Sequence, residues 1–112
     1  MLSRTADHLF WMSRYMERAE NLARLLDVTW QMSLVPQSLE TVNQSWNAIV
    51  ALNSLEEAFA AKYSTVNAEN VLRFMVSDAD NDASIHSCLR LARENAHAVR
   101  GTITTEMWEM LN

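Results

Sequence analysis

The residues of this chain with the clearest chemical potential stand together between positions 14 and 21. Arg14, Glu17, Arg18 and Asn21 lie in a segment whose other residues are largely apolar. A guanidinium group here can clamp a carboxylate or a phosphate, and a carboxylate beside it can act as an acid or a base. The structural alternative is a set of ion pairs that ties this segment to another helix. We favour the structural interpretation, because ion-pair networks also occur without a function.

A second group of charged residues stands near the C-terminus. Its members are Arg93, Glu94, His97 and Arg100. Glu94 and His97 have the spacing of half a di-metal carboxylate site, in which residues three apart hold one ion. The other half requires a second Glu-x-x-His and further inward-facing carboxylates, which Glu17, Glu56 or Glu57 replace only in part. We therefore expect no metal and no other cofactor, and we keep a metal-binding helical bundle as a third hypothesis.

The first group lies in a helix that we expect from about Arg4 to about Ser33. Its apolar residues follow a spacing of three and four, which is typical of the seam of a packed helix. Further apolar residues flank the charges on the other side, so the pattern predicts a helix buried on most faces. Glu17 and Arg18 should then be withdrawn from water and paired with the second charged group. The predicted seam consists of Leu9, Met12, Met16, Ala19, Ala23, Leu26 and Trp30.

Three more helices are predicted. One runs from Leu39 to Lys62 after a break at Pro36, and a short one runs from Ala68 to Val76 after an Asn67 cap. The last begins after an acidic connector, with Ser84 or Asp82 as its cap, and continues to the C-terminus. Its predicted seam is Ile85, Cys88, Ala92, Ala96, Val99, Ile103, Met107 and Met110. The pattern predicts an all-α fold, an antiparallel bundle of three long helices and one short helix.

Composition limits the class of protein. The 112 residues form one helical domain, because a single Gly and a single Pro leave little turn chemistry. The lone Cys88 and the lack of a signal peptide or a long apolar run indicate a cytoplasmic protein without a membrane span. The net charge of −5 argues against binding to nucleic acid. The last helix has no C-terminal cap, so we expect a longer protein and self-association of this part through Val99, Ile103, Met107 and Met110.

Two stretches of the sequence have a specific pattern. Residues 1–21 and 93–112 closely resemble the bacterial alpha-E domain family, which is named for its helical content and a Glu-Arg motif. The pair Glu17-Arg18 is similar to that motif, and the acidic connector before Ser84 is similar to the family's pattern. The resemblance covers the whole chain.

The resemblance implies an all-helical domain, usually part of a longer protein, of which we expect this chain to be the N-terminal part. Family members are encoded or fused beside circularly permuted ATP-grasp ligases, transglutaminase-like proteases and an N-terminal-nucleophile peptidase. This implies a bacterial system for the synthesis or modification of peptide or amide bonds. We therefore expect a helical accessory or partner module of the ATP-grasp and transglutaminase-like proteins. The alternative is an enzyme of that system that uses Glu17 and Arg18.

Overall fold

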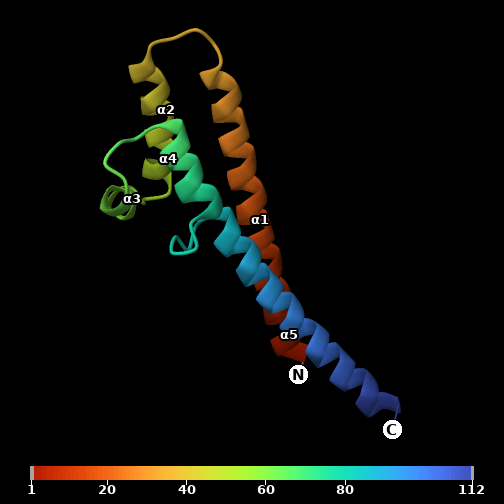
Figure 1. The fold of residues 1–112 in the computed structure, drawn as a ribbon. Coiled ribbons are helices and arrows are strands. Elements are labelled where there is room, and N and C mark those ends of the chain that lie inside the picture. The colour runs from red at the N-terminus through yellow and green to blue at the C-terminus, as the bar shows by residue number, and fades with distance from the viewer. Residues whose placement is uncertain (1, 112) are drawn as a thin grey trace.

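The fold is all-α, as predicted, and contains no strand among the residues described. The computed structural model describes residues 2–111, with side chains for residues 3–101, 105 and 110. The two longest helices, α1 and α5, run antiparallel, so the two ends of the chain lie at the same end of the molecule (Figure 1). In chain order the elements are α1 (Leu2–Ser33), α2 (Leu39–Leu52), α3 (Glu56–Lys62), α4 (Ala68–Leu72), the π-helical turn η1 (Arg73–Ser77) and α5 (Ile85–Leu111).

The predicted helix from Leu39 to Lys62 is wrong, because the chain turns after α2 and starts again as α3. Asn53 donates a hydrogen bond from Nδ2 to the carbonyl oxygen of Ile49 at 2.7 Å. Ser54 follows with a φ of 56°, in the left-handed region that stops a helix. Asn and Ser side chains compete with the helical backbone for hydrogen bonds, which explains a break without Gly or Pro. Leu52 is 75% exposed at this corner.

The caps that the sequence predicts for the later helices are confirmed. Asn67 accepts a hydrogen bond from the backbone N–H of Asn70 at 2.9 Å, and Ser84 accepts one from the N–H of Ser87 at 3.1 Å. Each cap satisfies a backbone donor that the first helical turn leaves unpaired. The short helix after Asn67 ends as the wider turn η1, so the predicted α-helix over residues 68–76 is only partly correct.

The hydrophobic core gathers at one end of the molecule. Trp46, Val71 and Met75 are fully buried there, in a cluster to which α2, α3, α4, η1 and the second half of α1 all contribute. The other half of α1 packs mainly on α5, which leaves the molecule 68 Å long and 28 by 18 Å across. Its radius of gyration is 18.6 Å, against about 13 Å for a compact domain of 100 residues. The predicted bundle is therefore a two-helix rod attached to a small core.

The buried side of α1 differs from the predicted seam. Ala19, Leu22 and Leu26 are buried, and a row of half-buried residues continues the same spacing of three and four. That row consists of Thr5, His8, Met12, Tyr15, Thr29 and Ser33. The predicted and observed seams share Met12, Ala19 and Leu26, whereas the rest of the predicted seam faces water.

We name the exposed remainder of the predicted seam the α1 flank. It consists of Leu9, Met16, Ala23 and Trp30. The three large side chains are 42%, 52% and 47% exposed, respectively. Because these residues are seven positions apart, they form a single row along the side of the helix. The expectation that α1 is buried on most of its faces is therefore wrong.

The seam of α5 is confirmed in its first half. Cys88, Ala92 and Val99 are buried, so Val99 does not belong to an uncovered surface as predicted. Met110 is 86% exposed, as expected. The side chains of Ile103 and Met107 lie outside the described residues, so the rest of the predicted surface has no structural description.

The first testable prediction concerns the core. Replacement of Trp46 by Ala should lower the free energy of unfolding by about 3–5 kcal/mol, because it empties a fully buried site. The indole nitrogen has no hydrogen-bond partner within the described structure, so the loss comes from packing. Denaturant unfolding followed by circular dichroism measures the change. Leu52→Ala, at the exposed end of α2, should change stability by less than about 0.5 kcal/mol, and equal losses in the two variants would contradict this core.

Candidate functional site

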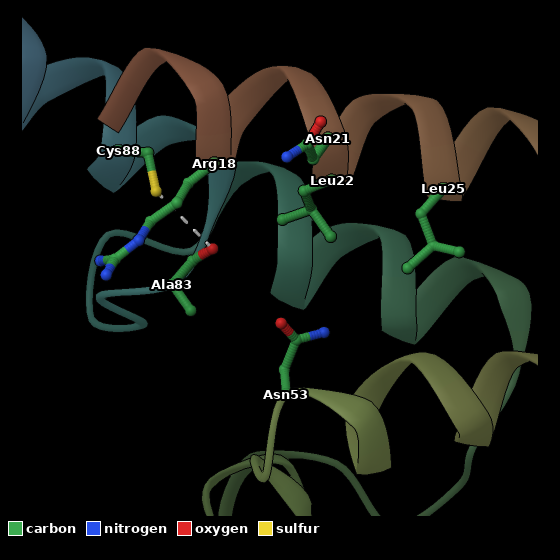
Figure 2. Close-up of a pocket in the computed structure, with 7 residues that line it drawn as sticks. All are labelled: Arg18, Asn21, Leu22, Leu25, Asn53, Ala83 and Cys88. Atoms are coloured by element: carbon green, nitrogen blue, oxygen red, sulfur yellow. Dashed lines mark hydrogen bonds between the residues drawn. The ribbon is translucent and has the colours of Figure 1, made fainter. Parts of the chain in front are cut away.

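A cleft lies where α1, the end of α2 and the start of α5 meet (Figure 2). Its volume is about 350 Å³, which is within the range of sites for small ligands. The helix α1 supplies one wall, and the other walls come from the residue after α2 and from the entrance to α5. The lining residues are Arg18, Asn21, Leu22, Leu25, Asn53, Ala83 and Cys88.

The helical spacing of α1 creates the first wall. Arg18, Asn21, Leu22 and Leu25 are three, four and seven positions apart, so their side chains share one side of the helix. Leu22 is buried and anchors this wall in the core. The Arg18 side chain extends from α1 toward the segment that carries Ala83 (Figure 2).

A network of hydrogen bonds fixes the opposite wall, residues 78–84. Ser84 donates from Oγ to the carbonyl oxygen of Asp78 at 2.8 Å, and the Asn81 amide donates to that of Phe74 at 3.0 Å. The Lys62 ammonium donates to the Asp78 carboxylate at 2.8 Å. Asn81 and Ser84 are buried, so the entrance to α5 is held by satisfied polar groups.

The Lys62–Asp78 pair has a defined pH dependence. The hydrogen bond from Lys62 holds the pKa of the Asp78 carboxyl below its usual value, and Asp78 raises the pKa of Lys62. A carboxyl group with a lowered pKa stabilises the folded chain at any pH above the pKa that the group has in the unfolded chain. This stability is lost as the pH falls through the pKa that the group has in the folded chain. The raised pKa of Lys62 gives stability that is lost as the pH rises through its folded value, so the pair supports the wall at neutral pH and is lost in acid and in strong alkali.

Cys88, at the start of α5, also lines the cleft. Its Sγ is 4.0 Å from the carbonyl oxygen of Ala83, and its side chain is buried. Burial raises the pKa of the thiol, while the charge of Arg18 opposes that shift to a smaller extent. At neutral pH the sulfur is thus a protonated thiol. This agrees with the place of Cys88 on the predicted seam of the last helix.

Arg18 and Glu17 differ from the prediction in their exposure and pairing. Both side chains are exposed, and neither forms an ion pair within the residues that the structure describes. The Arg18 guanidinium lies 5.7 Å from the centre of the Tyr15 ring, a cation–π distance. Glu17 does not line the cleft. The expectation of a buried ion pair at Glu17 and Arg18 is therefore wrong, because both side chains are exposed to water.

The structure divides the eight predicted site residues into separate groups. Arg18 and Asn21 line the cleft, whereas Arg14 and Glu17 are exposed on α1 outside its lining. The four on α5 are also exposed, and none lines the cleft; they are Arg93, Glu94, His97 and Arg100.

The register of the two long helices explains this separation. His8 and Asn95 lie opposite each other, with His8 Nδ1 2.9 Å from the Asn95 side-chain oxygen. Arg18 is ten residues beyond His8, which corresponds to about 15 Å along the helix axis. Arg18 is thus level with the start of α5 near Cys88, and the charged group on α5 is level with the first turns of α1. The predicted pairing of Glu17 and Arg18 with that group is wrong.

Glu94 and His97 remain an isolated pair of potential metal ligands. No group of three or more His, Cys, Asp and Glu side chains within the described part of the chain could hold a metal ion. Glu17, Glu56 and Glu57 therefore do not complete a site with them. Among the same residues, no helix combines the length and the apolar character that crossing a bilayer requires.

The sequence did not identify Asn53 and Ala83 as site residues. Asn53 reaches the cleft because the chain turns there, and no Gly or Pro in the sequence indicates that turn. Ala83 enters through the fold of the acidic connector. The contact between His8 and Asn95 also had no signal in the sequence, because the two residues are 87 positions apart.

A comparison with protein families assigns the chain to one of them. The model of Alpha-E, described as a predicted alpha-helical domain with a conserved ER motif, matches residues 1–112, so the chain belongs to this family. The dipeptide Glu-Arg occurs once in the sequence, at Glu17 and Arg18. The motif therefore coincides with the exposed pair on α1, of which Arg18 lines the cleft. No curated protein and no solved structure matches the chain.

The second prediction tests the exposure of this pair. Glu17→Gln and Arg18→Met should each change the free energy of unfolding by less than about 0.5 kcal/mol, because both side chains are exposed and lack an ion pair in the described residues. Thermal and denaturant unfolding of the two variants and of the double variant measure this. A buried pair would instead give a loss of about 3–5 kcal/mol in each single variant and a recovery in the double variant.

Proposed function

We propose that this domain is a non-catalytic partner module of a bacterial system that makes or modifies peptide or amide bonds. Its partners are the circularly permuted ATP-grasp protein and the transglutaminase-like protein that the family resemblance implies. The observation that carries the proposal is the α1 flank, a row of exposed apolar side chains on a long helix. A group of exposed large apolar side chains on one side of a helix favours a site for protein interaction.

The geometry of the α1 flank favours a helical partner. From Leu9 to Trp30 the row covers 21 residues, about 30 Å of helix. A spacing of seven matches the seam of two packed helices, in which side chains of one helix fill gaps in the other. Met16 adapts its shape to a partner, and Ala23 allows close approach. Trp30 provides the large aromatic contact that often dominates binding energy.

The chemistry of the cleft favours binding over catalysis. Its thiol, Cys88, is buried and protonated, and its guanidinium, Arg18, shares the cleft with amides and apolar side chains. The alternative of an enzyme that uses Glu17 and Arg18 needs both groups at one reacting centre. Glu17 lies outside the lining of the cleft, so the arrangement gives that alternative less support than the partner module.

The third prediction tests the partner surface. Met16→Glu combined with Trp30→Glu should abolish capture of the purified ATP-grasp and transglutaminase-like proteins by this chain, because each change puts a charge into an apolar contact. Co-purification on an affinity tag, followed by isothermal titration calorimetry, measures the loss. The matched control is Leu39→Glu, on α2 and 74% exposed, which should bind as the wild type does.

The outcomes of this experiment separate binding from folding. Circular dichroism must show the same helical content in all variants, because the replaced side chains are exposed. If the Met16→Glu, Trp30→Glu variant binds both proteins with unchanged affinity, the α1 flank is not the partner surface. If the wild-type chain binds neither protein, the proposal of a partner module in this system is wrong.

A further inference from the structure

The cleft at Arg18 contains polar groups that form no ion pair or side-chain hydrogen bond within the described part of the chain, although the Arg18 guanidinium also lies 5.7 Å from the centre of the Tyr15 ring. Arg18 has no ion pair there, and the side-chain amide of Asn21 has no hydrogen bond. Asn53 donates from Nδ2 to Ile49, which leaves its side-chain oxygen as an acceptor. The lining of the cleft thus includes a charged fork of N–H donors, a neutral amide and an acceptor. In Figure 2 the Arg18 guanidinium extends past Ala83, and Asn21 and Asn53 lie on the other side of the Arg18 stem.

The charge of the lining favours an anion with a single negative charge. Arg18 is the one charged residue among those that line the cleft. A planar guanidinium matches a carboxylate through two parallel hydrogen bonds. A phosphate monoester carries up to two charges and usually requires more cationic groups. The neutral Cys88 thiol in the lining adds no competing charge.

The remaining residues favour a peptide over a simple acid. Leu25 is half-buried in the lining beside Leu22, so the cleft has an apolar side next to its polar groups. The free oxygen of Asn53 can accept a backbone N–H of the ligand while Arg18 holds its carboxylate. A volume of about 350 Å³ is sufficient for one or two amino-acid residues.

We infer that this cleft binds the carboxylate of a peptide, with Arg18 as its clamp and Asn53 and Asn21 as hydrogen-bonding partners. The carboxylate is either the C-terminus of a chain or an acidic side chain, which share this chemistry. The inference is independent of the α1 flank, because Arg18 lies on another side of α1.

A titration of the isotope-labelled chain, followed by nuclear magnetic resonance, tests the inference. The probes are acetyl-Ala-Leu with a free carboxylate, its C-terminal amide, and acetyl-Ala-Asp-amide with a side-chain carboxylate. We expect acetyl-Ala-Leu to shift the side-chain amide signals of Asn21 and Asn53 and the backbone signal of Cys88. Its C-terminal amide should leave them in place. A shift by acetyl-Ala-Asp-amide assigns the acidic side chain as a second source of the carboxylate.

Variants separate the clamp from general charge effects. Arg18→Met should raise the dissociation constant by about tenfold or more, because it removes a hydrogen bond to a charged group. Arg18→Lys keeps the charge but loses the forked pair of donors, so its affinity should lie between those of the wild type and Arg18→Met. Arg14→Met removes an exposed charge outside the cleft lining and should bind as the wild type does.

Three results would overturn the inference. They are equal shifts by acetyl-Ala-Leu and its amide, wild-type affinity in Arg18→Met, and the absence of shifts for both carboxylate probes at millimolar concentration. The spectrum of each variant reports its folding directly. If Arg18→Met is unfolded, Arg18→Lys and Asn53→Ala provide the same comparison. The partner experiment uses other residues, so either proposal can fail while the other stands.

Discussion

The contact between α1 and α5 is the interaction on which the rest of the structure depends. Ala19 on α1 and Ala92 on α5 are buried in or near it, and such small side chains allow two helices to approach closely. The pair formed by His8 and Asn95 marks its register. This register places Arg18 level with the start of α5, so the cleft forms where the chain enters that helix. It also decides which side of α1 is covered and which sides remain exposed.

The contact between α1 and α5 alone does not form the cleft, because one of its walls comes from the residue after α2. The small core around Trp46 supplies it by holding the end of α2 against α1. The buried polar residues Asn81, Ser84 and Ser87 then fix the path from η1 into α5. When all buried polar groups of a segment form hydrogen bonds, the segment is held in one conformation, because any other conformation would leave some of these groups unsatisfied. The site is therefore rigid on the side opposite Arg18.

Much of the fold could be predicted from the sequence, because its signals are local. Pro36 ends the region of α1, and Asn67 and Ser84 cap the helices that follow them. The break at Asn53 could not be predicted, since its signal is a competing side-chain hydrogen bond and not a Gly or a Pro. The buried side of α1 could not be chosen either. Apolar residues occupy three neighbouring rows of that helix, and only tertiary packing decides which row is covered.

The same limit applies to the site. Arg18 and Asn21 could be predicted, because they are polar residues in an apolar helix. Their proposed partners on α5 were wrong, because spacing along one helix does not determine the register between two helices. Asn53 and Ala83 join the cleft through turns whose course is set by the whole chain. The position of the family's Glu-Arg motif on an exposed surface is thus a result of the structure alone.

The central claim is that α1 packs through one row of residues and exposes the α1 flank to water. Hydroxyl-radical footprinting of the isolated chain, read by mass spectrometry, tests it most directly, because the chain carries matched residue pairs. The account predicts rapid oxidation of Met16 and Trp30, which are exposed, and strong protection of Met75 and Trp46, which are fully buried. Protection of Met16 and Trp30 to the same extent as Met75 and Trp46, in a monomeric sample, would contradict it.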